Sequence, residues 1–356
     1  MVNSLASNFA GKRVLVTGHT GFKGSWLSLW LSHMGANVCG YALSPESQNG
    51  HFQLLHLDQL IDHRIGDIRD YPAVFRCFEE FQPEIVFHLA AQPLVRYSYS
   101  EPKDTFDVNI SGSVNILEAC RNTASVRALI YVTSDKCYRN NEWVWGYREN
   151  DELGGHDPYS ASKAAAEIVF SAYCDSFFRH RPNFGAASVR AGNVIGGGDW
   201  AEDRIVPDCI RALMANQPIQ IRNPASTRPW QHVLEPLHGY LSIAARLLDE
   251  PSAFSGAWNF GPNTDSVKTV LELAQLITGI WGGGTLKIAS ENSAVHEARL
   301  LHLSCDKAHQ MLGWYPCWDA TEAISETIYW YRSVIAHGND ALAISREQIE
   351  KYMEKR

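Results

Sequence analysis

The sequence predicts an α/β protein built on a doubly wound parallel sheet, with a smaller C-terminal cap of mixed α/β structure. In the first half, short apolar runs rich in β-branched residues alternate with longer helical stretches. A strand–helix–strand order requires parallel strands joined by right-handed crossovers. Beyond about residue 190 the alternation becomes irregular and glycine-rich segments interrupt the helices, which is typical of a cap over a binding site.

Five apolar runs predict strands, at residues 14–16, 38–41, 85–89, 129–133 and 187–189. Residues 84–91 are apolar almost without interruption, which fits a strand buried on both faces. Helices are predicted near residues 22–34, 72–82, 104–122 and 158–178 between the strands, and near 204–215, 233–249, 267–281 and 320–336 in the cap. The charged tail after Asn339 is compatible with a terminal helix.

Composition limits the classes of function. The chain has 356 residues and a formal net charge of −8, so nucleic acid and anionic membranes are not expected partners, and a phosphate-bearing ligand must be held by local basic residues. The 8 cysteines lack a Cys-x-x-Cys spacing and the 14 histidines form no ligand cluster, so no metal site is expected. No signal peptide or membrane-spanning run is apparent, which favours a cytoplasmic protein with reduced cysteines.

A glycine turn follows the first predicted strand and opens an apolar helix. Gly18, Gly21 and Gly24 have the spacing Gly-x-x-Gly-x-x-Gly. Such a turn lets backbone amides approach a pyrophosphate at a helix N-terminus, and it opens the first βα unit, so we favour a Rossmann-type dinucleotide site over a bare strand-to-helix turn. No Asp or Glu stands within residues 38–43 to hold a ribose 2′-hydroxyl, so this region does not decide between NAD and NADP.

Tyr159 and Lys163 lie four residues apart at the start of the helix near 158–178, so both side chains lie on one helix face. Asp157 is the expected N-cap and Pro158 the first helical residue. A lysine cation beside a phenol lowers the phenol pKa toward the range of a general base. The spacing alone also fits an ordinary solvated helix face, so the other motifs of the chain must decide whether this pair is catalytic.

With these two motifs, the chain resembles the extended short-chain dehydrogenase/reductase family, and within it the nucleotide-sugar dehydratases. The phrases at residues 18–27, 134–138, 145–149, 192–200 and 228–236 carry the closer resemblance. The family uses an Asp such as Asp67 on the adenine, and a segment such as 88–91 at the nicotinamide. The resemblance implies NAD as the cofactor, bound by Gly18, His19, Thr20, Gly21, Phe22, Lys23, Gly24, Asp67, Ile68, Leu89, Ala90, Ala91, Asn109, Tyr159 and Lys163.

The resemblance also implies a reaction, 4,6-dehydration of the sugar. In it Tyr159 takes the C4 hydroxyl proton while hydride leaves to NAD, and Ser134 hydrogen-bonds the reacting oxygen. Asp135 is the expected acid for the C6 hydroxyl. Related dehydratases carry a Glu base for C5 where this chain has Lys136, and a lysine can serve only if its pKa is lowered. The plain alternative is a polar strand end in which Asp135 and Lys136 neutralise each other.

The expected substrate is CDP-glucose, a choice that rests on resemblance because no local pattern encodes the base. Asn193, Arg204 and Arg228 are candidates for its diphosphate, whereas Arg190 at a strand end can equally be structural. A nucleotide-sugar 4-epimerase and a catalytically silent NAD(P)-sensing protein remain the alternatives. We expect a Rossmann domain at residues 1–190 with a return segment near 229–262, a nucleotide-sugar-binding domain at 191–228 and 263–356, and a homodimer or homotetramer.

Overall fold

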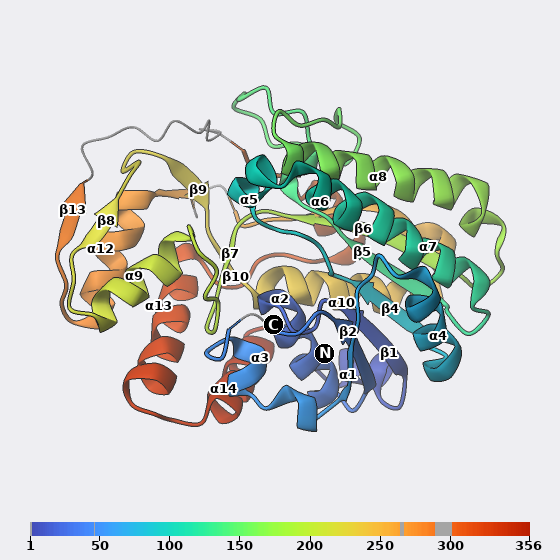
Figure 1. Ribbon diagram of the computed structural model, residues 1–356, viewed down its shortest axis with the longest axis horizontal. Coiled ribbons are helices and arrows are strands. Elements are labelled where there is room, and N and C mark those ends of the chain that lie inside the picture. The colour runs from blue at the N-terminus through green and yellow to red at the C-terminus, as the bar shows by residue number, and fades with distance from the viewer. Residues whose placement is uncertain (1, 46, 264–266, 289–300) are drawn as a thin grey trace.

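The computed structural model describes residues 2–45, 47–263, 267–288 and 301–356, apart from the side chains of 2–4 and 228. The described residues form a central sheet of seven parallel strands in the order β11-β6-β5-β4-β1-β2-β3 (Figure 1). The strands are β1 (Arg13–Thr17), β2 (Asn37–Ala42), β3 (Asp62–Ile65), β4 (Ile85–His88), β5 (Ala128–Val132), β6 (Gly185–Ala191) and β11 (Gly256–Phe260). The predicted doubly wound α/β class is confirmed.

Alternate residues of the strands pack against helices on opposite faces of the sheet. On β1, Val14 and Val16 contribute to the apolar cluster under α2 (Phe22–His33) and α10 (Leu234–Asp249). Leu15, between them, contributes to the cluster under the helices of the other face, which are α4 (Tyr71–Phe81), α7 (Ser113–Asn122) and α8 (Pro158–Ser176). Because side chains alternate along a strand, burial on both faces produces the continuous apolar runs seen in the sequence.

The apolar runs did not reveal the two edge strands, β3 and β11. The residues of β3 are Asp62, His63, Arg64 and Ile65, and none of them is buried. An edge strand is covered less completely than a central one, so it can be polar, and a search for apolar runs passes over it. Similarly, the helix expected from residue 267 begins only at Val270, because Val267–Thr269 form β12 and Thr269 with Glu272 makes a capping box.

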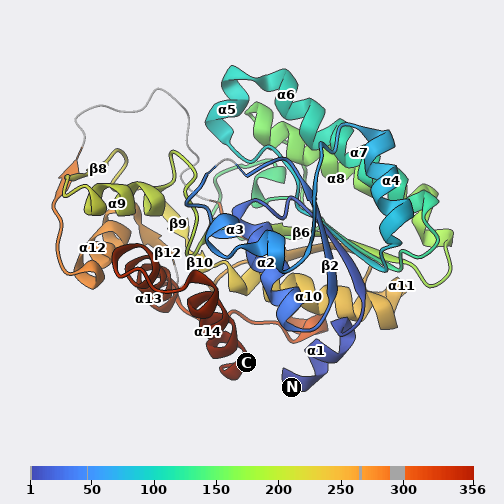
Figure 2. The same cartoon turned by 60° about the horizontal axis from the view of Figure 1, so that its bottom comes forward.

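The smaller part of the molecule lies beyond the carboxyl ends of the strands, at the left of Figures 1 and 2. Its described residues contain α9 (Ile205–Met214), α12 (Val270–Trp281), α13 (Ala320–Tyr331) and three two-stranded sheets. The sheets pair β7 with β10, β8 with β13, and β9 with β12. The remaining elements are α1 (Val2–Phe9), α3 (His51–Leu54), α5 (Val95–Ser100), α6 (Pro102–Phe106), α11 (Pro251–Phe254), α14 (Ala341–Glu354), β7 (Val194–Ile195), β8 (Ile219–Ile221), β9 (Thr227–Pro229), β10 (Gln231–His232), β12 (Val267–Thr269) and β13 (Leu286–Ile288).

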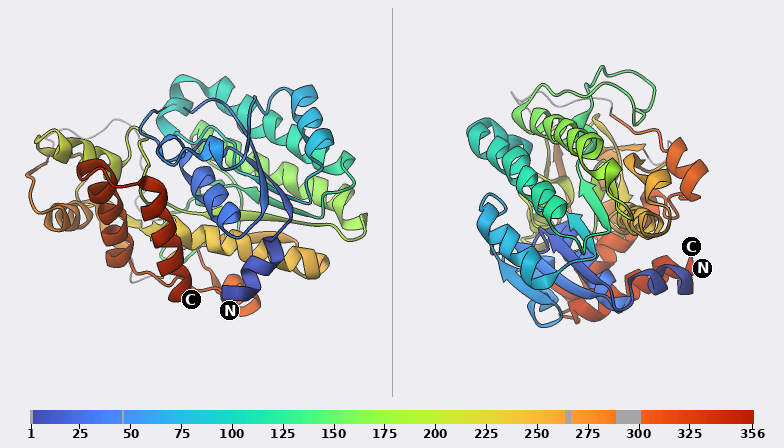
Figure 3. Two further views of the ribbon diagram at one scale, coloured as in Figure 1. Left: turned by 90° about the horizontal axis from the view of Figure 1, so that it is seen from below. Right: turned by 90° about the vertical axis from the view of Figure 1, so that its right-hand side faces the viewer.

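The predicted helices at 204–215, 267–281 and 320–336 are present as α9, α12 and α13, and the terminal helix is α14. The helix predicted at 233–249 is α10, which packs on the central sheet and not in the smaller part. In the described part of the chain, no helix has the length and apolar character needed to cross a bilayer. Helix α1 packs on α10 and α14 packs on α2, so the first and last helices lie close together (Figure 3). All 8 cysteines are free, and each is buried or half-buried.

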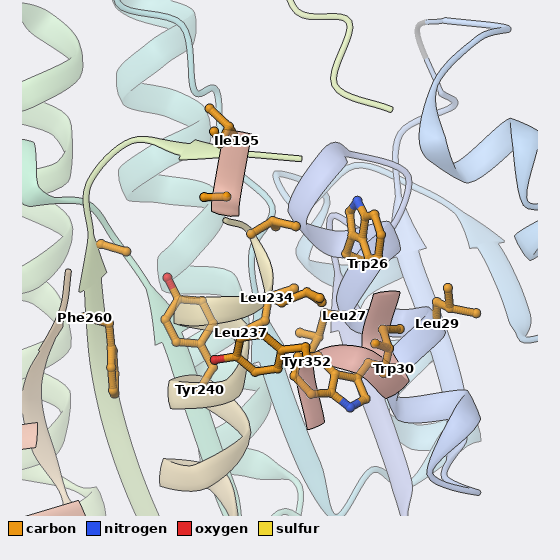
Figure 4. Close-up of a cluster of buried hydrophobic side chains, with 14 of the residues drawn as sticks. Trp26, Leu27, Leu29, Trp30, Ile195, Leu234, Leu237, Tyr240, Phe260 and Tyr352 are labelled. Carbon is orange, nitrogen blue, oxygen red and sulfur yellow. The ribbon is translucent and has the colours of Figure 1, made fainter. Parts of the chain in front are cut away.

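Large aromatic side chains join the two parts of the molecule. Trp26 and Trp30 of α2, Tyr240 of α10 and Tyr352 of α14 lie in one buried cluster (Figure 4). Trp30 and Tyr352 meet edge to face, with ring centroids 5.7 Å apart. Each such side chain contributes about 1.5–3 kcal/mol through its burial, so α14 is held firmly against the sheet helices.

A buried carboxylate on α10, that of Glu235, also binds α14 through a hydrogen bond. Glu235 is fully buried, and its Oε1 accepts hydrogen bonds from the Cys317 and Trp318 amides at 2.9 and 2.7 Å. Its Oε2 accepts from the Tyr352 hydroxyl at 2.7 Å and from Arg356 Nη2 at 3.1 Å. Burial raises the pKa of Glu235, and the Arg356 charge opposes that effect.

We predict that Arg356→Ala destabilises the fold by about 3 kcal/mol, because it leaves a buried carboxylate without its cation. Urea unfolding measures the loss. The deficit should shrink as the pH falls, since a protonated Glu235 needs no counter-charge, and Arg356→Lys should recover part of the stability. A deficit independent of pH would show that lost packing, not lost charge, is responsible.

Candidate active site

The glycine turn lies at the point where the strand order reverses. From β1 the chain continues through β2 and β3 to one edge of the sheet, whereas β4, β5 and β6 continue on the other side of β1. Ligands of doubly wound sheets bind in the crevice at this switch point, beyond the carboxyl ends of the strands. The turn between β1 and α2 therefore lies where a dinucleotide would bind.

The turn leaves no room for a side chain at Gly18 or Gly24. Gly18 has φ +76°, and a Cβ at this position would lie 2.7 Å from the Ala90 amide nitrogen. A Cβ on Gly24 would lie 2.1 Å from the Gly18 carbonyl oxygen. Between them, Thr20 donates a hydrogen bond to the Leu43 carbonyl at 3.0 Å, and Gly21 is the N-cap of α2. This close backbone cradle at a helix N-terminus fits a pyrophosphate.

His19 fills the space over β2. Its ring is buried, a Cβ on Gly40 would lie 2.3 Å from it, and its Nε2 is 2.6 Å from Nδ1 of His63 on β3. Burial lowers the pKa of His19 to about 3, with the neighbouring His63 adding to the effect. His19 is therefore neutral and packs between the turn and β2. At the start of α2, Phe22 lies toward the cap and Lys23 toward the reacting groups.

Thr17 and His88 fix the loop after β4. Thr17 Oγ1 accepts hydrogen bonds from the Leu89 and Ala90 amides at 3.2 Å each, so its own proton points to His88 Nδ1, 2.7 Å away. The proton of His88 is then on Nε2, which donates to Ser113 Oγ at 3.0 Å. Burial, and then the nearby Lys163, lower the pKa of His88 to about 3, so the ring is neutral. The loop carrying Leu89, Ala90 and Ala91 is thereby held beside the glycine turn.

Tyr159 and Lys163 lie side by side on α8, which begins as predicted. Asp157 is the N-cap and accepts a hydrogen bond from the Ser160 amide at 2.9 Å, and Pro158 follows. Tyr159 is 8% exposed and Lys163 6%. Burial raises the pKa of Tyr159 to about 12 and lowers that of Lys163 to about 8. The largest effects that lower the Tyr159 pKa come from Ser134 and Arg204, whereas the sequence had suggested Lys163.

Ser134, Asp135 and Lys136 form a tight turn directly after β5. Ser134 caps the 3₁₀ turn Asp135–Cys137: its Oγ accepts from the Lys136 amide at 3.2 Å and donates to Asp135 Oδ1 at 3.0 Å. Burial raises the pKa of Asp135, although Lys136 opposes the shift. A raised pKa favours the protonated carboxyl, which is the form that can act as a general acid. Lys136 is half-buried, and a Cβ on Gly192 would lie 3.0 Å from Asp135 Oδ2.

Two further cations face these groups. Lys23, from the glycine turn, has its pKa lowered to about 8 by burial and by Arg204, with Asp135 opposing. Arg204 precedes α9 and pairs with Asp199 through Nη1 at 2.8 Å. The Arg204 charge also acts on Tyr159, which places it near the reacting end of the site. The structure thus brings residues from α2, β5, α8 and α9 together.

The other predicted residues occupy more varied positions. Asp67 is held by Arg69, whose Nη2 lies 2.6 Å from Asp67 Oδ2, and Ile68 packs against Gly112. Asn109 accepts from the Gln92 amide at 2.8 Å and donates to Ser162 at 2.9 Å, so its amide joins the loop after β4 to α8. Asn193 is half-buried between β6 and β7. The backbone of Arg228 is part of β9, and its side chain lies outside the described residues.

Sequence reasoning missed two groups close to the reacting residues, Glu167 and Tyr240. Glu167, one turn after Lys163, is buried and pairs with Arg190, whose role the sequence left open. The sequence signal for Glu167 was its i, i+4 spacing from Lys163 on the same helix face. Tyr240 of α10 is fully buried, is sensitive to the Asp135 charge, and its hydroxyl has no hydrogen-bond partner in the described part of the chain. No sequence signal links Tyr240 to the site, because α10 is far from residue 135 in the sequence.

A glycine turn at the switch point of a parallel sheet, beside a buried tyrosine and lysine one helical turn apart, defines the class of extended short-chain dehydrogenases/reductases. The chain belongs to the family described as GDP-mannose 4,6 dehydratase, whose model matches residues 15–327. It is 50% identical over 347 residues to the CDP-glucose 4,6-dehydratase of Salmonella typhimurium, covering 96% of each chain. It is 27% identical to the human dTDP-D-glucose 4,6-dehydratase, covering 92% of each.

Solved structures share the architecture. The epimerase Mth375 of Methanothermobacter thermautotrophicus superposes with a TM-score of 0.80 at 25% identity, covering 95% of this chain and 97% of that one. The UDP-glucose 4-epimerase of Thermus thermophilus, in complex with NAD, gives a TM-score of 0.76 at 26% identity, covering 91% and 100%. The fold is therefore shared by epimerases and dehydratases, and the site residues must distinguish them.

We predict that Gly24→Ala weakens dinucleotide binding by at least about tenfold, or about 1.4 kcal/mol, because the new methyl group overlaps the Gly18 carbonyl. Isothermal titration with NAD measures the change. Gly279→Ala is the matched control, since a Cβ at that position on α12 meets no atom within 4 Å. Equal affinity in both variants would mean that the turn is not the pyrophosphate site.

Proposed function

We propose that the protein is a nucleotide-sugar 4,6-dehydratase that uses NAD to convert CDP-glucose to CDP-4-keto-6-deoxyglucose and water. The observation that carries the proposal is the position of the Ser134-Asp135-Lys136 turn, whose Ser134 and Asp135 lie beside Tyr159. Hydride transfer alone needs only Tyr159 and Lys163, whereas loss of water needs a second acid and base. The 50% identity to a CDP-glucose 4,6-dehydratase supports the choice of nucleotide.

The residues present fit NAD. The glycine turn offers a backbone cradle for its pyrophosphate, and Gly18, Gly21 and Gly24 allow the close approach. Asp67, Ile68 and the loop at 89–91 line the same edge of the sheet, and Asn109 positions that loop. When bound, NAD accepts hydride from C4 of the sugar and later returns it to C6, so no net oxidation occurs.

The first step is removal of the C4 hydroxyl proton. Tyr159 is the group placed to receive it, and the Ser134 hydroxyl can hydrogen-bond the same oxygen. Both Ser134 and the Arg204 charge favour the ionised phenol, which the buried environment otherwise opposes. The C4–H bond then breaks with its electron pair leaving as hydride, and the C4 oxygen becomes a carbonyl. Lys163, one turn along α8, supplies a proton-donating ammonium to the same region.

The second step is loss of water across C5 and C6. The C4 carbonyl makes the C5 proton acidic, and Lys136 takes that proton. The C5–H electrons form the C5–C6 double bond, the C6–O bond breaks, and Asp135 protonates the departing hydroxyl to give water. Asp135 suits this role because burial keeps its pKa raised. Hydride returns to C6, and Lys136 gives the proton back to C5.

The remaining assignments complete the proposal. Asn193, Arg204 and Arg228 bind the diphosphate, supplying local cations to a chain whose net charge is −8. Residues 1–190 with the segment near 229–262 bind NAD, and 191–228 with 263–356 bind the nucleotide sugar. The protein works in the cytoplasm as a homodimer or homotetramer. A 4-epimerase would need Tyr159 and Lys163 but no acid and base for C5 and C6, and so fits this site less well.

We predict that the purified protein converts CDP-glucose to a 4-keto-6-deoxy product, detected by its absorbance in alkali and by mass spectrometry as loss of one water. dTDP-, UDP- and GDP-glucose should react more slowly. A product of unchanged mass with inverted C4 would identify an epimerase. Silence with all four nucleotide sugars, with and without added NAD, would favour a sensor without catalysis.

We predict that Lys136→Ala and Asp135→Asn block different parts of the elimination. Lys136→Ala should abolish exchange of the C5 hydrogen with solvent deuterium in the 4-keto intermediate, since the base is gone. Asp135→Asn should retain C5 exchange but lower water loss by about 10²–10⁴-fold, the usual contribution of a general acid. Normal C5 exchange in Lys136→Ala would exclude Lys136 as the base.

A further inference from the structure

A buried carboxylate lies directly behind the candidate active site. Glu167 is on α8, one helical turn after Lys163 and two after Tyr159, so the three side chains share a helix face. Its side chain is 2% exposed, and that of its partner Arg190, near the carboxyl end of β6, is 4% exposed. The Glu167–Arg190 ion pair therefore lies next to Lys163, on the helix face that carries Tyr159 and Lys163.

The Glu167 carboxylate accepts four hydrogen bonds, two on each oxygen. Arg190 approaches as a fork, with Nε 2.8 Å from Oε1 and Nη2 2.8 Å from Oε2. Ser188 donates to Oε2 at 2.8 Å, and the Thr133 hydroxyl donates to Oε1. Burial alone would raise the pKa of Glu167, but Arg190 holds it below its usual range, so the carboxylate is ionised.

The same ion pair holds both ends of the catalytic turn. Thr133, bonded to Glu167, directly precedes Ser134. On the far side of the turn, the Tyr138 hydroxyl accepts from Arg190 Nη1 at 2.7 Å and donates to Asn259 at 2.8 Å. Arg190 Nη1 also donates to the Glu149 carbonyl at 2.9 Å. The turn carrying Ser134, Asp135 and Lys136 is thus held at both ends, because Thr133 before it and Tyr138 after it are hydrogen-bonded to the Glu167–Arg190 ion pair.

Glu167 also sets the charge around Lys163. The titratable groups that face the Lys163 ammonium are Tyr159 and Glu167 on α8, Cys137 on the turn, Lys23 on α2 and His88 on β4. Burial raises the pKa of the Cys137 thiol and lowers that of His88, so both are neutral. Among the described residues that face Lys163, Glu167 is therefore the only anion.

We propose that Glu167 and Arg190 are positioning residues of the proposed dehydratase reaction. Their ion pair holds the turn at 134–137 against α8 and keeps Lys163 in its charged, proton-donating form. A buried ion pair adds little net stability compared with an apolar pair of the same size, so stability alone does not explain its place here. The inference rests on the proposed function, because only the dehydratase needs both the Tyr159–Lys163 pair and the turn in one fixed arrangement.

Glu167→Gln tests the proposal, because it removes the charge while keeping the size of the side chain. Lys163 has a pKa of about 8 with Glu167 present; without the anion, burial lowers that pKa further. The alkaline limb of kcat/KM for CDP-glucose should then move to lower pH by about one unit. Amide hydrogen exchange of the peptide containing residues 133–138, followed in the protein without sugar, should become faster.

Glu235→Gln is the matched control. Glu235 is also a buried helical carboxylate with an arginine partner, but it lies at the junction with α14 and not beside Lys163. It should lower the free energy of unfolding as Glu167→Gln does, yet leave the alkaline limb and the exchange at 133–138 unchanged. If the two variants behave alike in all three measurements, the Glu167–Arg190 pair is structural and the proposal is overturned.

A second variant covers the case in which Glu167→Gln does not fold. Glu167→Asp keeps the charge and shortens its reach, so the alkaline limb should stay in place while exchange at 133–138 becomes faster. A shifted limb with unchanged exchange would contradict the proposal. Failure of the unaltered protein to make a 4-keto product would count against the proposed function. Hydrogen exchange at 133–138 tests separately whether the Glu167–Arg190 pair holds the turn in place, because that measurement needs no reaction of the sugar.

Discussion

The burial of proton-carrying groups at the carboxyl edge of the sheet is the constraint on which the site depends. Tyr159, Lys163 and Asp135 are all nearly inaccessible to water, and burial is the largest influence on the pKa of each. Removing charges from water is expensive unless partners compensate. Glu167 and Arg190, with all the hydrogen bonds of the carboxylate made by the protein, provide that compensation within the helix and strands that carry the reacting residues.

Desolvation also explains how one pocket can hold an acid and bases together. It favours the neutral form of each group, so the pKa of Asp135 is raised while those of Lys23 and Lys163 are lowered. Lys23 shows the effect clearly, since its pKa falls to about 8 beside Arg204 and Lys163. Charges from α2, β5, α8 and α9 meet only because the parallel strands end at one edge, so the chemistry follows from the topology.

The sequence predicted the central strands, the cap helices and the residues of the turn and of α8, because these depend on local signals: apolar runs, caps and fixed spacings. It missed β3, whose Asp62 and Arg64 are polar because an edge strand need not be buried on both faces. It left Arg190 undecided and passed over Glu167 and Tyr240, because their positions near the site depend on elements that are far apart in the sequence. It also named Lys163 as the main influence on the Tyr159 pKa, where Ser134 and Arg204 act more strongly, since rotamers and burial are not encoded in a spacing.

In the proposed reaction a single site removes hydride from C4, eliminates water and returns the same hydride to C6. CDP-glucose carrying deuterium at C4 tests it directly, with the product analysed by NMR and mass spectrometry. We expect CDP-4-keto-6-deoxyglucose in which the deuterium is found at C6. Deuterium retained at C4 of a sugar that has kept its water, or lost to an external acceptor, would contradict the proposed reaction.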